Sequence, residues 1–140
     1  VVPIMLNKID ANEAPTINGD GSQAYDFIYV EDVARANVAA VNSDMKHGFY
    51  NVGTEVQTSI KELCDTILRL KSSDLDVTYV PYSEDDARQL VQNRIGSAEK
   101  ASKEINFDYK YSLDQGLQKL IDWRDSKGIT EEYKAKVVVA

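Results

Sequence analysis

Residues 18–36 read Asn18-Gly19-Asp20-Gly21-Ser22-Gln23-Ala24-Tyr25-Asp26-Phe27-Ile28-Tyr29-Val30-Glu31-Asp32-Val33-Ala34-Arg35-Ala36, and the rest of the chain is organised around them. The segment 19–22 predicts a turn, because glycine reaches positive φ without steric cost and Asp and Ser side chains bond to nearby backbone. The segment 27–30 is aromatic and β-branched, which predicts a short buried strand. Glu31-Asp32 predicts the start of a helix, because carboxylates are favourable near the positive end of its dipole. We assign Asp32 this structural role rather than acid/base chemistry.

Outside this segment, hydrophobic spacing predicts further helices and strands. A short amphipathic helix is expected up to Asn12, with its apolar stripe at Val2, Met5, Leu6 and Ile9. Ser59 and Ser112 each begin a capping-box pattern and so predict two more helix starts, and Ser97 is expected to cap another helix. Strands are expected at 48–53, 77–81 and 91–96. The helix after Val30 has small alanines around an apolar face, so we expect it to be buried on more than one side.

The central segment carries the pattern Gly-Asp-Gly-Ser-Gln-x-x-Asp-Phe-x-Tyr-Val-x-Asp-Val-Ala-x-Ala. This pattern resembles the C-terminal half of the NAD-dependent nucleotide-sugar epimerases and dehydratases of the UDP-glucose 4-epimerase type, which are extended short-chain dehydrogenases. Tyr-Asn-Val-Gly at 50–53 and Glu-Lys-Ala at 99–101 match in the same order, so the resemblance extends from Val2 to about Lys127. It implies an α/β fold of short strands with several helices, the small substrate-binding domain of the family, without the Rossmann domain. We expect this domain to span 1–128 and a C-terminal tail to span 129–140.

Composition narrows the possible partners and compartments. The chain has 140 residues, is 43% hydrophobic and 28% charged, and carries a net charge of −7, which argues against binding to nucleic acid or to an anionic membrane. A single cysteine, Cys64, excludes an intramolecular disulfide and fits a reducing compartment. No apolar run approaches the length of a membrane-spanning helix, and no signal peptide is recognisable, so we expect a cytoplasmic protein. The first residue is Val rather than Met, which fits a piece of a longer chain.

The resemblance implies a set of substrate-binding residues and no catalytic ones. In the family the segment before the turn passes the nucleotide base, which here makes Thr16 and Asn18 the contacting positions. Tyr25 stands where many members have an arginine that meets the diphosphate. Arg88 and Arg94 lie in and beside the irregular segment that corresponds to the family's phosphate loop. Two alternatives stay open: 14–18 as an ordinary strand entering a turn, and both arginines as surface charges that offset Glu84, Asp85 and Asp86.

Several chemistries lack the residues they require. Gly19-Asp20-Gly21 has no third glycine and precedes a predicted strand, so it is not a dinucleotide fingerprint. None of the eight tyrosines has the lysine four residues later that family catalysis needs. One histidine, His47, and one distant cysteine cannot form an ordinary zinc site. Cys64 lies on a predicted apolar stripe, which favours a buried, inert thiol over a nucleophile.

The sequence therefore predicts the substrate-binding portion of an NAD-dependent nucleotide-sugar epimerase or dehydratase, inactive in isolation. We expect NAD to bind the full-length protein but not this chain alone. The expected partners are a nucleotide-sugar, the N-terminal Rossmann domain of the same longer chain, and a second copy in a homodimer of that longer protein. The detached chain is expected to self-associate, with the N-terminal helix as part of the exposed apolar surface. The competing class is a non-catalytic ligand-sensing or protein-interaction module with the same fold.

Overall fold

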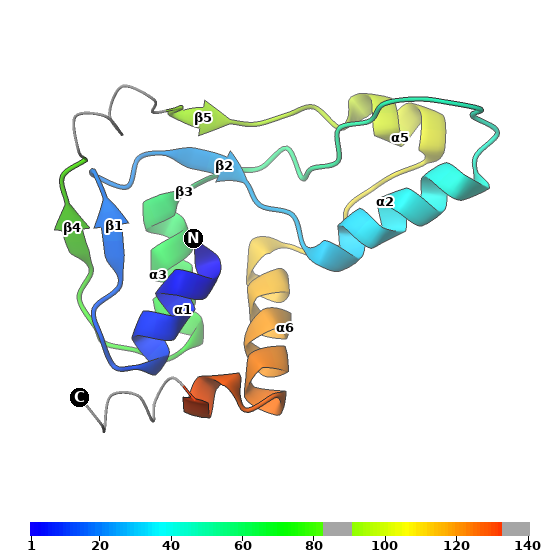
Figure 1. Cartoon of the computed structure of the whole chain (residues 1–140). Helices are drawn as coiled ribbons and strands as arrows, with labels where there is room; N and C mark the ends of the chain where they lie inside the picture. Colours follow the sequence, from blue (N-terminus) through cyan, green and yellow to red (C-terminus); the bar gives the residue numbers. More distant parts are fainter. Residues whose placement is uncertain (83–90, 133–140) are drawn as a thin grey trace.

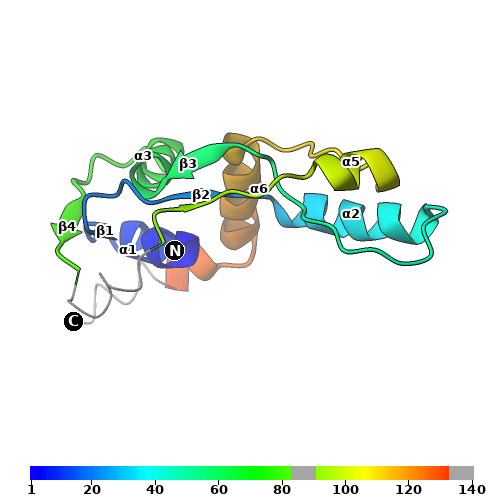
Figure 2. The same cartoon turned by 90° about the horizontal axis from the view of Figure 1, so that it is seen from above.

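The fold consists of a helical body and a projecting arm (Figure 1). The computed structural model describes residues 1–82 and 91–132. The body contains the helices α1 (Val2–Asp10), α3 (Ile60–Leu70) and α6 (Leu113–Ser126). The arm is made by α2 (Val30–Asn42) and α5 (Glu99–Ile105), which extend away from the body side by side in both views (Figures 1 and 2). The α/β fold class predicted from the sequence is confirmed.

Short strands connect the helices in two small sheets. In one sheet β1 (Thr16–Asn18) pairs in parallel with β4 (Thr78–Val80), with Thr16 opposite Thr78. In the other sheet β2 (Ala24–Asp26) lies between two neighbours: it is antiparallel to β3 (Gln57–Ser59) and parallel to β5 (Asn93–Arg94). The central segment of the sequence thus supplies the central strand.

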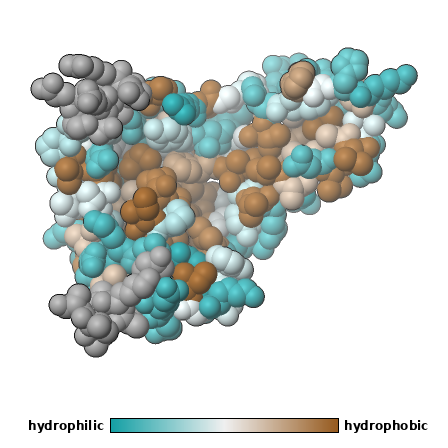
Figure 3. Space-filling model, in the orientation of Figure 1, coloured by the Kyte–Doolittle hydropathy of each residue, from teal (hydrophilic) through white to brown (hydrophobic). Residues whose placement is uncertain are grey.

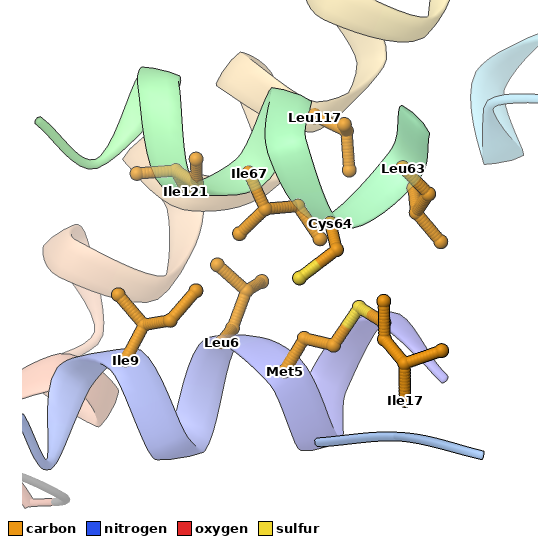
Figure 4. Close-up of a cluster of buried hydrophobic side chains, with 9 residues drawn as sticks. All are labelled: Met5, Leu6, Ile9, Ile17, Leu63, Cys64, Ile67, Leu117 and Ile121. Atoms are coloured by element: carbon orange, nitrogen blue, oxygen red, sulfur yellow. The ribbon is translucent and has the colours of Figure 1, made fainter. Parts of the chain in front are cut away.

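The body is held together by one apolar cluster to which α1, β1, α3 and α6 all contribute (Figure 4). Its buried members are Met5, Leu6, Ile9, Ile17, Leu63, Cys64, Ile67, Leu117 and Ile121. Each large apolar side chain of this kind contributes roughly 1.5–3 kcal/mol when it leaves water. The predicted stripe on α1 is therefore correct, but its assignment to an exposed surface is wrong, because these side chains form the core.

Cys64 is fully buried in this cluster, and burial raises the pKa of its thiol to about 11. The thiolate is the reactive form of cysteine, so we expect the native protein to resist thiol reagents at neutral pH. Labelling with a colourless disulfide reagent that releases a chromophore should be slow without denaturant and rapid in guanidinium chloride. Labelling of the native chain as fast as that of free cysteine would contradict this prediction.

Both predicted capping boxes form. The Ser59 hydroxyl accepts a hydrogen bond from the backbone N–H of Glu62, whose carboxylate accepts from the N–H of Ser59, and Ser112 and Gln115 do the same at α6. Ser97 is one position too early to be the cap of α5, which begins after Ala98. There the Glu55 carboxylate accepts hydrogen bonds from the Ala98 N–H and from the Ser97 hydroxyl.

Two predicted strands are absent from the described residues. The segment 27–29 is irregular and Val30 already begins α2, while 48–53 has no strand partner. A strand requires a neighbour to share its backbone hydrogen bonds, and the pairing of β2 with β3 and β5 ends at Asp26. The strand predicted at 27–30 is therefore placed too late in the sequence, because the strand that forms here is β2 at Ala24–Asp26.

The arm has its own small core, and α2 is less buried than its composition predicts. Ala36 packs with Ala101, Ile105 and Phe107 in a second cluster of buried residues. Within α2 the buried residues are Asp32 and Ala36, whereas the predicted apolar face carrying Val38 and Val41 is exposed. The prediction that α2 is buried on more than one side is therefore wrong for this chain.

Candidate functional site

A glycine turn joins the two sheets and is held from several sides. Gly19 and Gly21 have φ values of +71° and +77°, a region that side-chain-bearing residues rarely adopt. The Gly19 N–H donates to the Val80 carbonyl over 2.8 Å, and the Lys61 N–H donates to the Gly21 carbonyl over 3.1 Å. These bonds fix the turn against the end of β4 and the start of α3, so its position is set by the body of the protein.

A cleft of about 480 Å³ lies beside this turn. Its walls come from α1, β1, the start of β2 and the start of α3, and its lining residues are Val1, Ile4, Met5, Thr16, Ile17, Asn18, Gln23, Tyr25, Ile60 and Tyr82. Apolar side chains thus alternate with a hydroxyl, two amides and two phenols. Clefts of this size and mixed lining are typical sites for small molecules.

The structure brings together most of the residues that the sequence analysis singled out. Thr16, Asn18 and Tyr25 all line the cleft. Arg94 is the register partner of Tyr25 across the β2–β5 pair, so the two side chains lie on the same face of that sheet. Arg88 lies outside the described residues.

Three further residues belong to the site and were missed. Tyr82 follows β4, and because β1 and β4 are parallel, their carboxyl ends meet at the same edge, which places Tyr82 beside Gly19. A Cβ on Gly19 would lie 2.1 Å from the Tyr82 ring, so only glycine permits this contact. Gln23 adds an amide to the lining, and Lys8 donates from its ammonium to the Thr16 hydroxyl over 2.6 Å. Gln23 belongs to the glycine-turn pattern, but no local pattern marks Lys8 or Tyr82, because the packing of α1 and the pairing of β1 with β4 bring them to the site.

The pKa values of Tyr82 in the cleft and of Asp20 in the turn are shifted. Burial raises the pKa of the Tyr82 phenol, and the nearby Tyr25 and Asp20 raise it further, so at neutral pH Tyr82 keeps a proton to donate. Hydrogen bonds from the Ser22 side chain and backbone N–H lower the pKa of Asp20, which keeps this carboxylate ionised at the rim. Tyrosine rings can stack on a planar ring, amides can pair with its polar edge, and cations can meet an anionic group. The arrangement therefore suits binding of a small molecule that carries a planar ring and an anionic group.

Metal binding and membrane insertion require other arrangements of residues. The described part of the chain nowhere gathers three His, Cys, Asp or Glu side chains in a way that could hold a metal ion. Among residues 1–82 and 91–132, none of the helices combines the length and hydrophobicity that crossing a membrane requires. His47 is exposed in the loop after α2.

Comparison with known proteins identifies relatives of most of the chain. Residues 1–53 match the model of the NAD dependent epimerase/dehydratase family. The structure of a UDP-glucose 4-epimerase from Thermotoga maritima with UDP-glucose superposes with a TM-score of 0.80 and 27% identity, over 90% of this chain and 39% of that one. A UDP-N-acetylglucosamine 4-epimerase from Methanobrevibacter ruminantium in complex with UDP-N-acetylmuramic acid gives a TM-score of 0.80 and 29% identity, over 91% of this chain and 39% of that one.

A plant protein shows the same partial correspondence in sequence. The bifunctional UDP-glucose 4-epimerase and UDP-xylose 4-epimerase 3 of Arabidopsis thaliana is 32% identical over 117 residues, which are 80% of this chain and 32% of the relative. The chain thus spans less than half of the length of each of these relatives. These matches confirm the resemblance found in the central segment.

Proposed function

Because the chain belongs to the NAD-dependent epimerase/dehydratase family, we propose that it supplies the nucleotide-sugar-binding portion of such an enzyme. The observation that supports this most directly is the gathering of Thr16, Asn18 and Tyr25 in one cleft with Arg94 beside it. These positions come from three strands, and Arg94 is far from the other three in sequence. Two similar proteins carry UDP-sugars in their structures, which fits a cleft with this chemistry.

The base and the diphosphate of a nucleotide-sugar have suitable counterparts in or beside the cleft. The base can stack on the ring of Tyr25 or Tyr82, with Asn18 and Gln23 in reach of its polar edge. The diphosphate carries two negative charges and needs cationic donors when it leaves water, and arginine can bond two phosphate oxygens at once. Arg94, next to Tyr25 across the sheet, is our assignment for this role, with Arg88 as a second donor from the segment beyond Tyr82.

The described residues do not fit the pyrophosphate of NAD. Gly19-Asp20-Gly21 leads into β2, whereas the glycine turn of a dinucleotide site leads into the N-terminus of a helix that receives the pyrophosphate. We therefore propose that NAD, the tyrosine–lysine pair and their Rossmann domain lie in the part of the longer protein outside these residues. The unit 1–128 then serves as its substrate-binding domain and is inactive alone.

Titration calorimetry of the chain with UDP-glucose and with NAD tests whether this chain binds the nucleotide-sugar and not NAD. We expect saturable binding of UDP-glucose and no saturable binding of NAD at micromolar concentrations. No turnover of UDP-glucose is expected in the same samples. Saturable binding of NAD by the chain alone would overturn the proposal, and so would failure of every nucleotide-sugar tested to bind.

Replacing Arg94 by methionine tests the phosphate assignment. A charge-assisted hydrogen bond contributes about 1.5–3 kcal/mol, so Arg94→Met should weaken nucleotide-sugar binding roughly ten- to a hundredfold. Arg69→Met is the matched control, because Arg69 is an exposed arginine that pairs with Asp114 between α3 and α6. In the longer protein the affinity for NAD should hardly change. Equal affinities in Arg94→Met and wild-type protein would show that Arg94 does not bind the diphosphate.

A further inference from the structure

The stretch that carries Arg94 lies on the surface, where it crosses from the body to the arm (Figure 1). Residues 91–97 are all exposed. In the space-filling view, hydrophilic and hydrophobic residues are mixed along this upper edge of the molecule (Figure 3). The strand β5 contributes only two residues to the pairing with β2. The position of this stretch is therefore set by hydrogen bonds rather than by burial of apolar side chains.

One attachment lies just before Arg94. The side-chain amide of Gln57 on β3 donates to the side-chain oxygen of Asn93 over 2.9 Å. Because β2 lies between β3 and β5, this hydrogen bond crosses β2. Successive side chains of a strand point to opposite faces, so Asn93 lies on one face of the sheet and Arg94 lies with Tyr25 on the other. The hydrogen bond therefore holds β5 from the face opposite to Tyr25.

The second attachment lies just after Arg94. The Glu55 carboxylate accepts a hydrogen bond from the Ser97 hydroxyl over 2.9 Å and another from the Ala98 N–H. These bonds hold the chain three and four residues beyond Arg94, where α5 begins. Glu55 and Gln57 are two residues apart, so one short segment holds both ends of the stretch that carries Arg94.

Glu55 is itself held in an unusual backbone conformation. Its φ is +61°, a region that residues with side chains rarely adopt and that persists only where the surroundings impose it. The Asp26 carboxylate imposes it here, because it accepts the N–H groups of Thr54 and Glu55 over 2.9 Å and the Thr54 hydroxyl over 2.6 Å. A Cβ on Gly53 would lie 2.3 Å from this carboxylate, so glycine permits the approach. Asp26 follows Tyr25 in β2, and one strand thus lines the cleft and fixes the loop that carries Glu55.

We propose that Glu55 is a positioning residue for Arg94 and thereby for the diphosphate of the nucleotide-sugar. An exposed arginine has many rotamers, and binding must order its side chain together with any mobile backbone that carries it. Glu55 lowers this cost because it fixes the backbone on the far side of Arg94 before the ligand arrives. This role rests on the nucleotide-sugar function proposed above. Glu55 acts on Arg94 and not on the ligand.

Titration calorimetry of the full chain with UDP-glucose measures the effect. Glu55→Ala should weaken binding about three- to tenfold, the cost of ordering a mobile arginine and its backbone. Electrostatics alone predicts the opposite sign, because removal of an acidic charge favours an anionic ligand. Glu99→Ala is the matched control, since Glu99 is an exposed carboxylate on α5 that pairs with Lys103. It should bind UDP-glucose at least as tightly as the wild-type protein.

The conservative variant separates positioning from a general loss of structure. Glu55→Gln keeps a side-chain oxygen that can accept the bonds from Ser97 and Ala98, so it should restore the wild-type affinity. Hydrogen exchange of the Ala98 amide should speed up in Glu55→Ala and stay slow in Glu55→Gln. Circular dichroism checks that each variant remains folded.

A double-mutant cycle tests whether the effect passes through Arg94. Glu55→Ala should weaken UDP-glucose binding in the wild-type background and have no further effect in Arg94→Met. Equal losses in the two backgrounds, or failure of Glu55→Gln to restore binding, would overturn the positioning role. If Arg94→Met weakened binding but Glu55→Ala did not, this role would be wrong and the nucleotide-sugar function would stand. If the wild-type protein bound no nucleotide-sugar, the function and the positioning role would both be wrong.

Discussion

Replacing Asp10 by alanine is expected to lower the free energy of unfolding by about 3–5 kcal/mol, because it removes a buried carboxylate that pairs with two cations. The Asp10 side chain is fully buried at the end of α1. The Arg124 guanidinium from α6 lies 3.0 Å from one carboxylate oxygen, and the Lys71 ammonium after α3 lies 2.7 Å from the other. One carboxylate thus joins three helices at the bottom of the core.

Chemical denaturation monitored by circular dichroism gives the required free energies. The matched control is Asp65→Ala, which removes an exposed ion pair with Lys61 on the surface of α3. Surface pairs of this kind contribute about 0–1 kcal/mol, so the control should change stability little. Similar losses in the two variants would contradict the structural role of Asp10. Arg124→Met should show how much of the cost comes from the Asp10–Arg124 pair, because it removes the cation but replaces the stem with an apolar side chain.

Asp32→Ala is expected to cost about 2–4 kcal/mol, since it leaves two backbone donors without an acceptor. The carboxylate is completely buried and accepts hydrogen bonds from the N–H groups of Lys110 and Tyr111 at 3.0–3.1 Å. It also pairs with Arg35, which in turn donates to the carbonyl of Asp108. Asp32 therefore attaches the start of α2 to the segment that leads into α6. Without it we expect the arm to lose its fixed position.

The neighbouring Asp108→Ala provides the control, because that contact uses only the backbone carbonyl of Asp108 and its side chain is exposed. Hydrogen exchange of the amides of residues 110 and 111 should speed up in Asp32→Ala and stay slow in the control. Asp32→Asn, which keeps one oxygen acceptor, should lie between the two. If Asp32→Ala proved as stable as the wild-type protein, with unchanged exchange, the connection we describe would not exist.

Asp32 and Asp10 also show which interactions can be predicted from neighbouring residues in the sequence and which cannot. The sequence places Asp32 in the first turn of a helix, where a carboxylate interacts favourably with the helix dipole. The structure agrees with this structural assignment. Its backbone donors, Lys110 and Tyr111, however, are 78 and 79 residues away and cannot be predicted from the local spacing. In the same way Arg124 has the sequence context of a helix C-terminus, but it is buried against Asp10 at the far end of the chain.

The sequence by itself determined the features that depend on neighbours along the chain. The two capping boxes, the apolar stripe of α1 and the glycine turn all form as predicted, because their hydrogen bonds and side-chain directions are set within a few residues. The family pattern also singled out Thr16, Asn18 and Tyr25, which the structure places in one cleft.

Only the tertiary structure decided which segments become strands, which face of α2 stays exposed and which residues complete the cleft. Tyr82 reaches Gly19 because β1 pairs with β4, and Lys8 reaches Thr16 because β1 lies near α1. The segment 27–29 is not a strand because none of residues 1–82 and 91–132 pairs with it. Pairing and burial depend on groups that are distant in sequence. A helix can therefore be predicted from its own residues, whereas a strand, a buried charge or a binding cleft requires the partner that the fold brings to it.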